Sequence, residues 1–276
     1  MPKTTDKLIE MNGLRFHYRD WRSTKPDAED LVLLHGYTGH ARSWDWFAER
    51  MSDSYRVLAL DQRGHGETQW AQPSEYGSLK MVEDLKTFVA AHGLESFNLL
   101  GLSMGGIVSI HYAGSCPAEL KKLVIVDIGP KISTSGTSRI QTSVQQSDVF
   151  ENVDEAYERS RAANTVPPDE HLRHRVENNM MMLADGRYTY RYDRALRDTS
   201  VDRPRPSEEE GWQAVQNILA PTLLVRGELS DILSVDVANR MVREMHDCRL
   251  ETVAGSGHSV PLDKPEGFLA AVQSFL

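Results

Sequence analysis

Short runs of apolar residues, each ended by turn residues, alternate along the chain with longer amphipathic stretches. Residues 31–34 are continuously apolar, as in a strand that is covered on both faces of a sheet. Residues 78–92 instead place apolar side chains on one face of a helix. Strands that alternate with helices predict βαβ units, and therefore an α/β fold built around a parallel sheet.

The same pattern predicts the remaining elements of this fold. We expect strands at residues 7–10, 14–18, 57–60, 97–100, 123–126, 221–225 and 249–253, and helices at 41–51, 104–113, 234–245 and the carboxyl end. The first two strands flank Asn12 and Gly13, a pair that favours the tight turn of a β-hairpin.

The alternation stops between residues 131 and 216, where no run resembles a central strand. We therefore predict a core made of residues 1–130 and 217–276, interrupted by a helical cap at residues 131–216. The run Met180-Met-Met182 is either the wall of an apolar pocket or, the favoured interpretation, part of the cap's own core. Trp44 and Trp46 are also candidate pocket walls, although packing is the favoured interpretation for each of them.

Charge and composition exclude several classes of function. The chain has 276 residues, with 31 Lys and Arg against 40 Asp and Glu, which gives a net charge of −9. A protein of this charge repels nucleic acid and anionic membranes, so we expect a small-molecule substrate and no nucleic-acid or membrane partner. No apolar run approaches the roughly 20 residues that span a bilayer. The amino end lacks the apolar core of a signal peptide, which predicts a cytoplasmic protein. Cys116 and Cys248 have no disulfide-like or zinc-like spacing.

Ser103 is the candidate nucleophile, in the motif G-L-S-M-G. The pattern G-x-S-x-G alone occurs by chance in roughly one chain in ten of this length. Its position is more specific, because it joins the predicted strand 97–100 to the predicted helix 104–113, as in a nucleophile elbow. So sharp a turn strains the serine and needs small residues two positions to either side, here Gly101 and Gly105.

His258 is the candidate base for this serine. It follows the last predicted strand in the glycine-rich loop A-G-S-G-H, where the strand's carboxyl end would deliver an imidazole to a crevice. A serine hydroxyl needs such a base to take its proton. Among the other histidines, His35 and His65 lie in predicted turns, which their hydrogen bonds would hold.

Asp231 is the predicted acid, which would fix the tautomer of the histidine and stabilise the imidazolium. It follows the predicted strand 221–225 in R-G-E-L-S-D and completes the order Ser, Asp, His that accompanies a nucleophile elbow. Asp127 is the second candidate, because it ends the strand beside that of the nucleophile. Glu228 is the third.

Backbone N–H groups are the expected donors for the oxyanion that forms during acyl transfer. The Met104 N–H follows the nucleophile directly. The Tyr37 N–H belongs to the loop H-G-Y after the predicted strand 31–34. A reaction with these parts needs no cofactor and no metal.

Together the motifs H-G-Y-T-G, D-Q-R-G-H-G, G-L-S-M-G-G, R-G-E-L-S-D and G-S-G-H resemble the α/β-hydrolase superfamily in residue type and in order, over essentially the whole chain. The chain is most similar to capped serine esterases and carbon–carbon bond hydrolases. The resemblance implies an eight-stranded, mostly parallel sheet with helices on both faces and a cap between strands six and seven. It places the nucleophile, acid, base and oxyanion donors at the following residues: Ser103, Asp231, His258, Tyr37 and Met104.

We therefore expect an enzyme that hydrolyses a carboxylic ester with a small to medium acyl group through an acyl-enzyme. Cleavage of a carbon–carbon bond or a lactone by the same triad is the alternative. A third hypothesis is a ligand-sensing receptor that keeps this fold and uses its pocket for binding.

Overall fold

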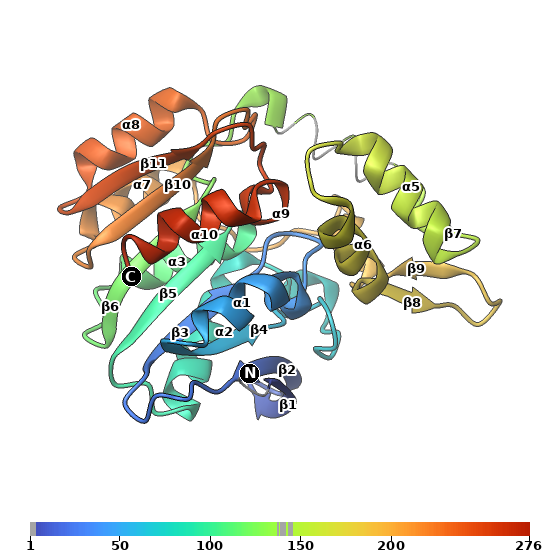
Figure 1. Ribbon diagram of the computed structural model, residues 1–276, viewed down its shortest axis with the longest axis horizontal. Helices are drawn as coiled ribbons and strands as arrows, with labels where there is room; N and C mark the ends of the chain where they lie inside the picture. The colour runs from blue at the N-terminus through green and yellow to red at the C-terminus, as the bar shows by residue number, and fades with distance from the viewer. Residues whose placement is uncertain (1–3, 137, 139–141, 143–145) are drawn as a thin grey trace.

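The computed structural model describes residues 4–136, 138, 142 and 146–276. Its main sheet has eight strands in the order β1-β2-β4-β3-β5-β6-β10-β11 (Figure 1). The strands of this sheet are β1 (Thr4–Met11), β2 (Leu14–Trp21), β3 (Glu29–Leu34), β4 (Tyr55–Leu60), β5 (Phe97–Leu102), β6 (Leu120–Val126), β10 (Thr222–Gly227) and β11 (Cys248–Val253). β2 is antiparallel to β1 and to β4, and the other pairs of neighbouring strands are parallel. The predicted mostly parallel α/β sheet is confirmed.

Helices cover both faces of this sheet. The helices that accompany it are α1 (Asp45–Met51), α2 (Ser78–Ala91), α3 (Met104–Ala113), α7 (Glu208–Asn217), α8 (Val235–Glu244), α9 (Val260–Asp263) and α10 (Pro265–Gln273). Side chains of α2, α3, α7 and α8 share one hydrophobic core with Val32 and Leu34 of β3, whereas those of α1 and α10 share the other with Leu31 and Leu33. The continuous apolar run of this strand therefore reflects burial on both faces.

Two predicted elements differ in detail from the structure. The predicted helix at residues 41–51 is a 3-10 turn, η1 (Ala41–Trp44), followed by α1. The predicted hairpin is present and longer than expected, because Met11 pairs with Leu14 and the strands continue outward from there. Asn12 and Gly13 both have positive φ, at 50° and 76°, which is the backbone of the tight turn that this pair favours.

The chain that joins β6 to β10 forms a second part of the structure, outside the main sheet. We call residues 131–207 the inserted segment. Its described elements are β7 (Val149–Phe150), α5 (Val153–Ala163), α6 (Asp169–Asn178), β8 (Met180–Met182), β9 (Tyr188–Tyr190) and the 3-10 turn η3 (Arg194–Arg197). They extend to one side of the main sheet (Figure 1). A helical segment was expected here. The structure differs, because β7, β9 and β8 form a three-stranded sheet beside the helices.

The methionine run belongs to the small sheet of the inserted segment. Met180 is buried in a separate hydrophobic core with Phe150, Tyr157 and Val176. Met182, at the other end of this short strand, is 65% exposed. The favoured interpretation, packing within this segment, therefore agrees with the position of Met180.

The division into core and cap stays a proposal, and α7 is the element that bears on its second boundary. All of this helix except Asn217 lies inside the predicted range 131–216, yet Trp212 and Val215 share the hydrophobic core of α3. We therefore place the end of a cap before α7. Residues 137, 139–141 and 143–145, which also fall in the predicted range, lie outside the described residues.

Hydrogen bonds join the inserted segment to loops at the carboxyl end of the sheet. The Gly66 N–H donates to the carbonyl of Arg191 at 2.9 Å, and the Asp193 N–H donates to that of Gly64 at 2.8 Å.

None of the helices in the described part of the chain is long and apolar enough to cross a membrane.

Candidate active site

Ser103 lies at the turn from β5 into α3. Its φ of 53° and ψ of −113° are strained for a residue with a side chain. A Cβ added at Gly101 would lie 2.3 Å from the Gly105 carbonyl oxygen, and one at Gly105 would lie 2.5 Å from that of Leu34. No side chain larger than hydrogen fits these positions. The turn therefore exposes the Ser103 hydroxyl at the amino end of α3, where the helix dipole favours negative charge.

His258 lies in the loop between β11 and α9. Its Nε2 is 2.9 Å from the Ser103 Oγ. The loop is anchored by the Asp263 carboxylate, which accepts a hydrogen bond from the Gly257 N–H at 2.8 Å and one from the side chain of Asn164 at 2.8 Å. Asn164 belongs to the inserted segment, so this carboxylate joins that segment to the loop of His258. Burial raises the pKa of Asp263 despite these hydrogen bonds.

Asp127 supplies the carboxylate that meets the other side of the imidazole. It follows β6 directly and is fully buried. Its Oδ2 lies 2.8 Å from the His258 Nδ1 and also accepts a hydrogen bond from the Ser230 hydroxyl. Its Oδ1 accepts the Gly227 N–H at 2.9 Å. Three donors thus converge on one carboxylate and fix its orientation.

The structure places Asp127, the second candidate, and not the predicted Asp231 against the His258 Nδ1. Asp231 lies in the loop after β10, where its carbonyl accepts hydrogen bonds from the hydroxyls of Ser133 and Ser135. Asp127 also precedes His258 in the chain, so the order Ser, Asp, His does not discriminate between the two candidates. β6 and β10 are neighbouring parallel strands, and their carboxyl ends reach the same edge of the sheet. Sequence alone leaves both aspartates within plausible reach of one imidazole.

The same loop contains the third candidate, Glu228, and a further residue, Ser230, that no sequence motif indicates. Glu228 accepts the Gly255 N–H at 2.7 Å, which braces the loop that leads to His258. The Ser230 hydroxyl donates to Asp127. The sequence signal for Ser230 is its position directly before Asp231. A loop that brings Asp231 near the site also brings the neighbouring polar side chain, here that of Ser230.

The loop that carries Tyr37 lies directly against the nucleophile. A Cβ added at Gly36 would lie 3.2 Å from the Ser103 Cβ. Thr38 has a positive φ of 61°, and the Gly39 N–H donates to the Gly36 carbonyl at 2.9 Å, so the loop forms a tight turn. The inserted segment holds it from outside, because the Asn179 side chain donates to the Thr38 carbonyl at 3.0 Å.

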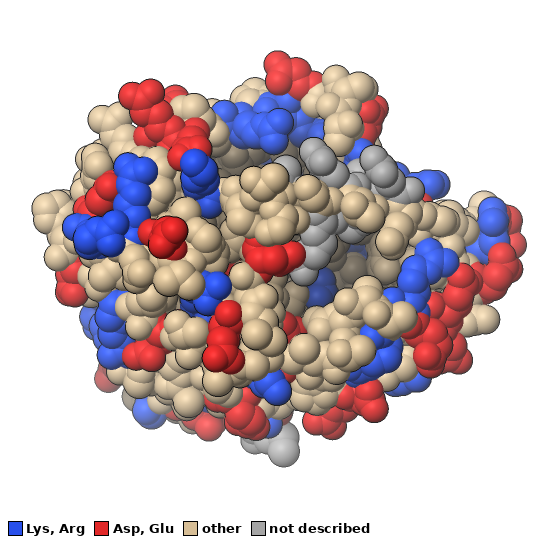
Figure 2. Space-filling view, turned by 90° about the horizontal axis from the view of Figure 1, so that it is seen from above, with Lys and Arg blue, Asp and Glu red and all other residues tan. Residues whose placement is uncertain are grey.

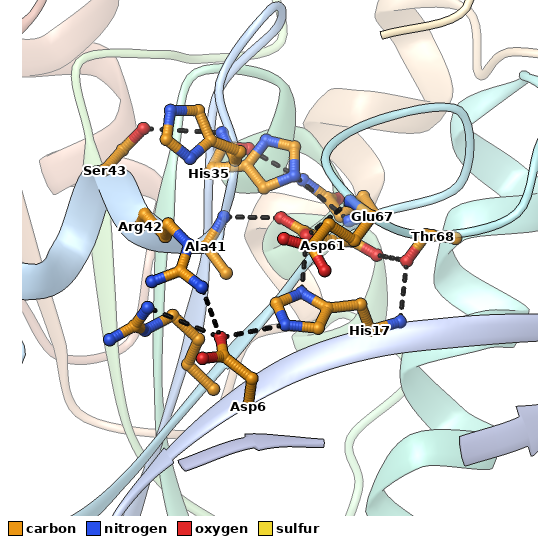
Figure 3. Close-up of polar contacts among 12 residues, drawn as sticks. Asp6, His17, His35, Ala41, Arg42, Ser43, Asp61, Glu67 and Thr68 are labelled. Carbon is orange, nitrogen blue, oxygen red and sulfur yellow. Dashed lines mark hydrogen bonds and ion pairs between the residues drawn. The ribbon is translucent and has the colours of Figure 1, made fainter. Parts of the chain in front are cut away.

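A buried aspartate, Asp61, braces the base of this loop (Figure 3). Its Oδ1 accepts the Ala41 N–H at 2.5 Å, and its Oδ2 accepts the Glu67 N–H at 2.9 Å. The His17 Nδ1 lies 2.6 Å from the same Oδ2, and the His17 Nε2 lies 3.1 Å from Asp6. Burial favours the neutral form of Asp61, but the hydrogen bond and charge of His17 outweigh it and lower the pKa of Asp61 to about 2.

His35 has a structural role in the same loop. Its Nδ1 lies 2.8 Å from the Gly36 carbonyl, so this nitrogen carries the proton, and its Nε2 accepts the Gln62 N–H at 3.0 Å. Burial lowers the pKa of His35 to about 4, which keeps the ring neutral. His65 is likewise buried, with its Nδ1 3.0 Å from the Arg63 carbonyl. Both histidines hold turns by hydrogen bonds, as expected from the sequence.

A cavity of about 1060 Å³ opens above Ser103 and His258. It lies between the core and the inserted segment, where the molecule is hollowed when seen from above (Figure 2). Leu102, Ile107 and Leu172 contribute apolar wall. Trp44 and Trp46 also line it, although Trp44 is 1% exposed and packs chiefly in the core beside α1. The volume is large enough for a small organic substrate.

The arrangement is suited to nucleophilic catalysis. A hydroxyl, an imidazole and a buried carboxylate form one hydrogen-bonded series that opens into a cavity. Among the residues that the structure describes, no three side chains of His, Cys, Asp or Glu are grouped so that they could hold a metal ion.

Comparison with known proteins shows the family of the chain. Residues 31–271 match the model of the alpha/beta hydrolase family. The chain is 30% identical to N-formylmaleamate deformylase of Pseudomonas putida, over 97% of this chain and 95% of the relative. It is 29% identical to 3-hydroxybutyrate-oligomer hydrolase of Cupriavidus necator, over 98% and 96%. An alpha/beta hydrolase crystal structure from Novosphingobium aromaticivorans superposes with a TM-score of 0.87 at 27% identity, over 99% and 98% of the two chains. The chain is therefore an enzyme of the alpha/beta hydrolase family.

Proposed function

We propose that this enzyme is a serine hydrolase that cleaves a carboxylic ester with a small to medium acyl group through an acyl-enzyme intermediate. The observation that carries the proposal is the series Ser103 Oγ to His258 Nε2 at 2.9 Å and His258 Nδ1 to Asp127 Oδ2 at 2.8 Å. In this series the Nδ1 proton faces the carboxylate. The Nε2 lone pair is then available to take the serine proton.

The reaction follows from these positions. His258 removes the proton of Ser103 as the oxygen attacks the ester carbonyl, and the buried Asp127 stabilises the imidazolium that forms. The imidazolium then gives its proton to the leaving alcohol, and the acyl group remains on Ser103. A water molecule repeats the sequence, with His258 again as base, and releases the acid.

The N–H groups of Tyr37 and Met104 are the proposed oxyanion donors. Three observations support them. The loop of Tyr37 is packed against the nucleophile at Gly36. Among the described residues, the Tyr37 N–H donates to no protein acceptor. Met104 opens α3, so its N–H lies in the first turn, where a helix leaves its donors unpaired.

Turnover of short-chain p-nitrophenyl esters tests the proposal. Ser103→Ala is expected to lower kcat at least 1000-fold, which is about the loss seen when a triad nucleophile is removed. Ser115→Ala is the matched control, because this serine is exposed beyond the carboxyl end of the same helix. Equal activity of Ser103→Ala and the native enzyme would overturn the assignment.

A second candidate reaction is hydrolysis of an acylated nitrogen, which the name of the deformylase relative favours. The same series of groups serves it, because the leaving amine also takes its proton from His258. Carbon–carbon bond or lactone cleavage is the further alternative. A panel of matched esters, N-formyl amides, lactones and vinylogous diketones separates them by their kcat/KM values.

A receptor without catalysis is the remaining hypothesis. It predicts that a fluorophosphonate probe fails to label Ser103 in the folded protein. Our proposal predicts labelling that is lost in Ser103→Ala and kept in Ser115→Ala.

A further inference from the structure

The wall of the active-site cavity is positively charged in a chain whose net charge is −9. Its described lining contains four arginines and no aspartate or glutamate. The arginines are Arg159, Arg175, Arg197 and Arg205. An anionic substrate would therefore enter without meeting a lining carboxylate, whereas a cationic one would be repelled.

Two of these arginines are already held by the protein. Arg159 binds Glu155 at 2.7 Å and the Ser147 carbonyl at 2.6 Å. Arg197 donates to the hydroxyl of Tyr192 at 3.1 Å. Arg205 is exposed at the surface, where water solvates its charge.

Arg175 differs from the other three. It lies in α6 of the inserted segment and is half-buried at the cavity wall. Its carbonyl lies 3.4 Å from the His40 Nε2, which places the residue beside the loop that carries Tyr37. Its guanidinium makes no hydrogen bond or ion pair with any residue that the structure describes.

An unpaired guanidinium that has lost part of its water costs free energy, unless a ligand supplies the missing hydrogen bonds. Burial lowers the pKa of Arg175 despite the opposing charges of Tyr190 and Asp263, neither of which forms a hydrogen bond or ion pair with its guanidinium. The group nonetheless stays charged at neutral pH. A planar guanidinium binds a carboxylate through two parallel hydrogen bonds, so a carboxylate is its natural partner.

We propose that the substrate carries a carboxylate in addition to the bond that is cleaved, and that Arg175 binds this carboxylate through its unpaired guanidinium. This inference rests on the proposed function, because it names the substrate class of the same site. Arg175 acts here as a specificity-determining residue, whereas Ser103 and His258 perform the chemistry.

The test compares esters that differ in one group. The 4-nitrophenyl half-esters of succinate, glutarate and adipate are matched with the butyrate, valerate and hexanoate esters, in which a methyl group replaces the carboxylate. We expect kcat/KM for at least one half-ester to exceed that of its neutral partner 10-fold or more. Arg175→Ala is expected to lower kcat/KM for that half-ester about 10- to 100-fold, chiefly through KM, and to change the neutral ester less than 3-fold.

Arg173→Ala is the matched control. Arg173 lies on the same helix, binds Asp154 at 3.0 Å and is exposed outside the cavity lining. It is expected to leave the preference for the half-ester unchanged. Arg175→Gln is a second variant, which removes the charge and keeps much of the side chain's volume. For Arg175→Ala and Arg175→Gln, a melting temperature within a few degrees of that of the native enzyme shows that the variant is folded.

A binding measurement keeps the test independent of turnover. Titration calorimetry of glutarate into the Ser103→Ala protein should show binding that is lost when Arg175→Ala is added, and glutaramide should not bind. No preference for any half-ester together with no binding of glutarate would overturn the inference. If Ser103→Ala hydrolyses both ester series as fast as the native enzyme, the proposed function fails instead.

Discussion

Asp127 is the residue at which the site's geometry is most constrained. Its carboxylate is fully buried and accepts hydrogen bonds from His258, Gly227 and Ser230. A buried carboxylate without partners would be strongly unfavourable, so each donor both satisfies it and holds it against the imidazole. At this scale the proposed acid is the carboxylate that these donors surround.

A pair of substitutions compares the two aspartates. Asp127→Asn is expected to lower kcat by about 1000- to 10000-fold, because the amide stabilises the wrong tautomer of His258 and leaves the imidazolium without a counter-charge. Asp231→Asn should stay within about 3-fold of the native enzyme. Steady-state kinetics on p-nitrophenyl esters, with circular dichroism to verify folding, provides the measurement. The reverse ranking of the two variants would return the role to Asp231.

At the scale of elements, the site depends on the contact between the β5–α3 turn and the loop that follows β3. Gly105 lies against the carbonyls of Leu34 and His35, at 2.5 and 2.7 Å from where a Cβ would stand. These atoms are backbone, which cannot move aside as a flexible side chain does. The nucleophile and the proposed oxyanion loop can therefore lie this close together only because Gly105 has no side chain.

Gly105→Ala should separate these two elements. We expect the free energy of unfolding to fall by about 2 kcal/mol or more, as for overpacking of a close-packed contact, and kcat to fall at least 10-fold. Gly93→Ala is the comparison, because Gly93 has a positive φ of 60° and open space around it. That variant should lose about 1 kcal/mol of stability and keep its activity. Urea denaturation and ester turnover measure the two effects, and full activity of Gly105→Ala would contradict the account.

The contact between Asn164 and Asp263 links the inserted segment to the loop of His258. Asn164→Asp would place two carboxylates against each other in a site where burial already raises the pKa of Asp263. We expect this variant to lower kcat several-fold, more strongly at pH 8 than at pH 6, because the repulsion requires both groups to be ionised. Asn164→Ala removes the hydrogen bond without the charge and should lose less activity. Pre-steady-state or steady-state rates at the two pH values decide between these outcomes.

For the whole molecule, buried histidines dominate the response of stability to pH. Burial lowers the pKa of His35 and His40 to about 4 and that of His65 to about 3. The unfolded chain therefore binds more protons than the folded one as the pH drops below about 6.5, which destabilises the fold.

Two histidines oppose this trend. A hydrogen bond with Asp45 raises the pKa of His174, and the second of the two is His17. Burial lowers its pKa, but the hydrogen bond and charge of Asp61 raise it by more, so its contribution is fully present below pH 6.5 and is lost at higher pH.

We therefore expect the free energy of unfolding to decrease between pH 7.5 and 5.5, by about 1 kcal/mol for each of the three buried neutral histidines, less the opposing contributions of His17 and His174. Urea denaturation at the two pH values measures the decrease. His65→Gln should reduce the pH dependence, whereas His246→Gln, at an exposed position, should leave it unchanged. Equal or greater stability at pH 5.5 would contradict this interpretation.

Several features of this protein were determined by local sequence alone. The continuous apolar run at Leu31, the helical spacing after Ser78 and the Asn12-Gly13 turn each depend on near neighbours, so the predicted parallel sheet is the one observed. The nucleophile's turn is equally local, because two glycines beside Ser103 are needed wherever a strand turns so sharply into a helix. The small sheet of the inserted segment was not foreseen, since its strands are too short for a periodic pattern.

The choice between Asp127 and Asp231 required the tertiary structure. Both follow neighbouring parallel strands and both precede His258, so no local pattern separates them. What decides is the register of β6 against β10 and the path of the loop after β10, which turns Ser230 toward Asp127. The unpaired state of Arg175 is likewise visible only in the tertiary structure. A sequence contains the charge, but only packing between distant segments shows that no carboxylate of the described chain forms an ion pair with it and that it lines the cavity above Ser103.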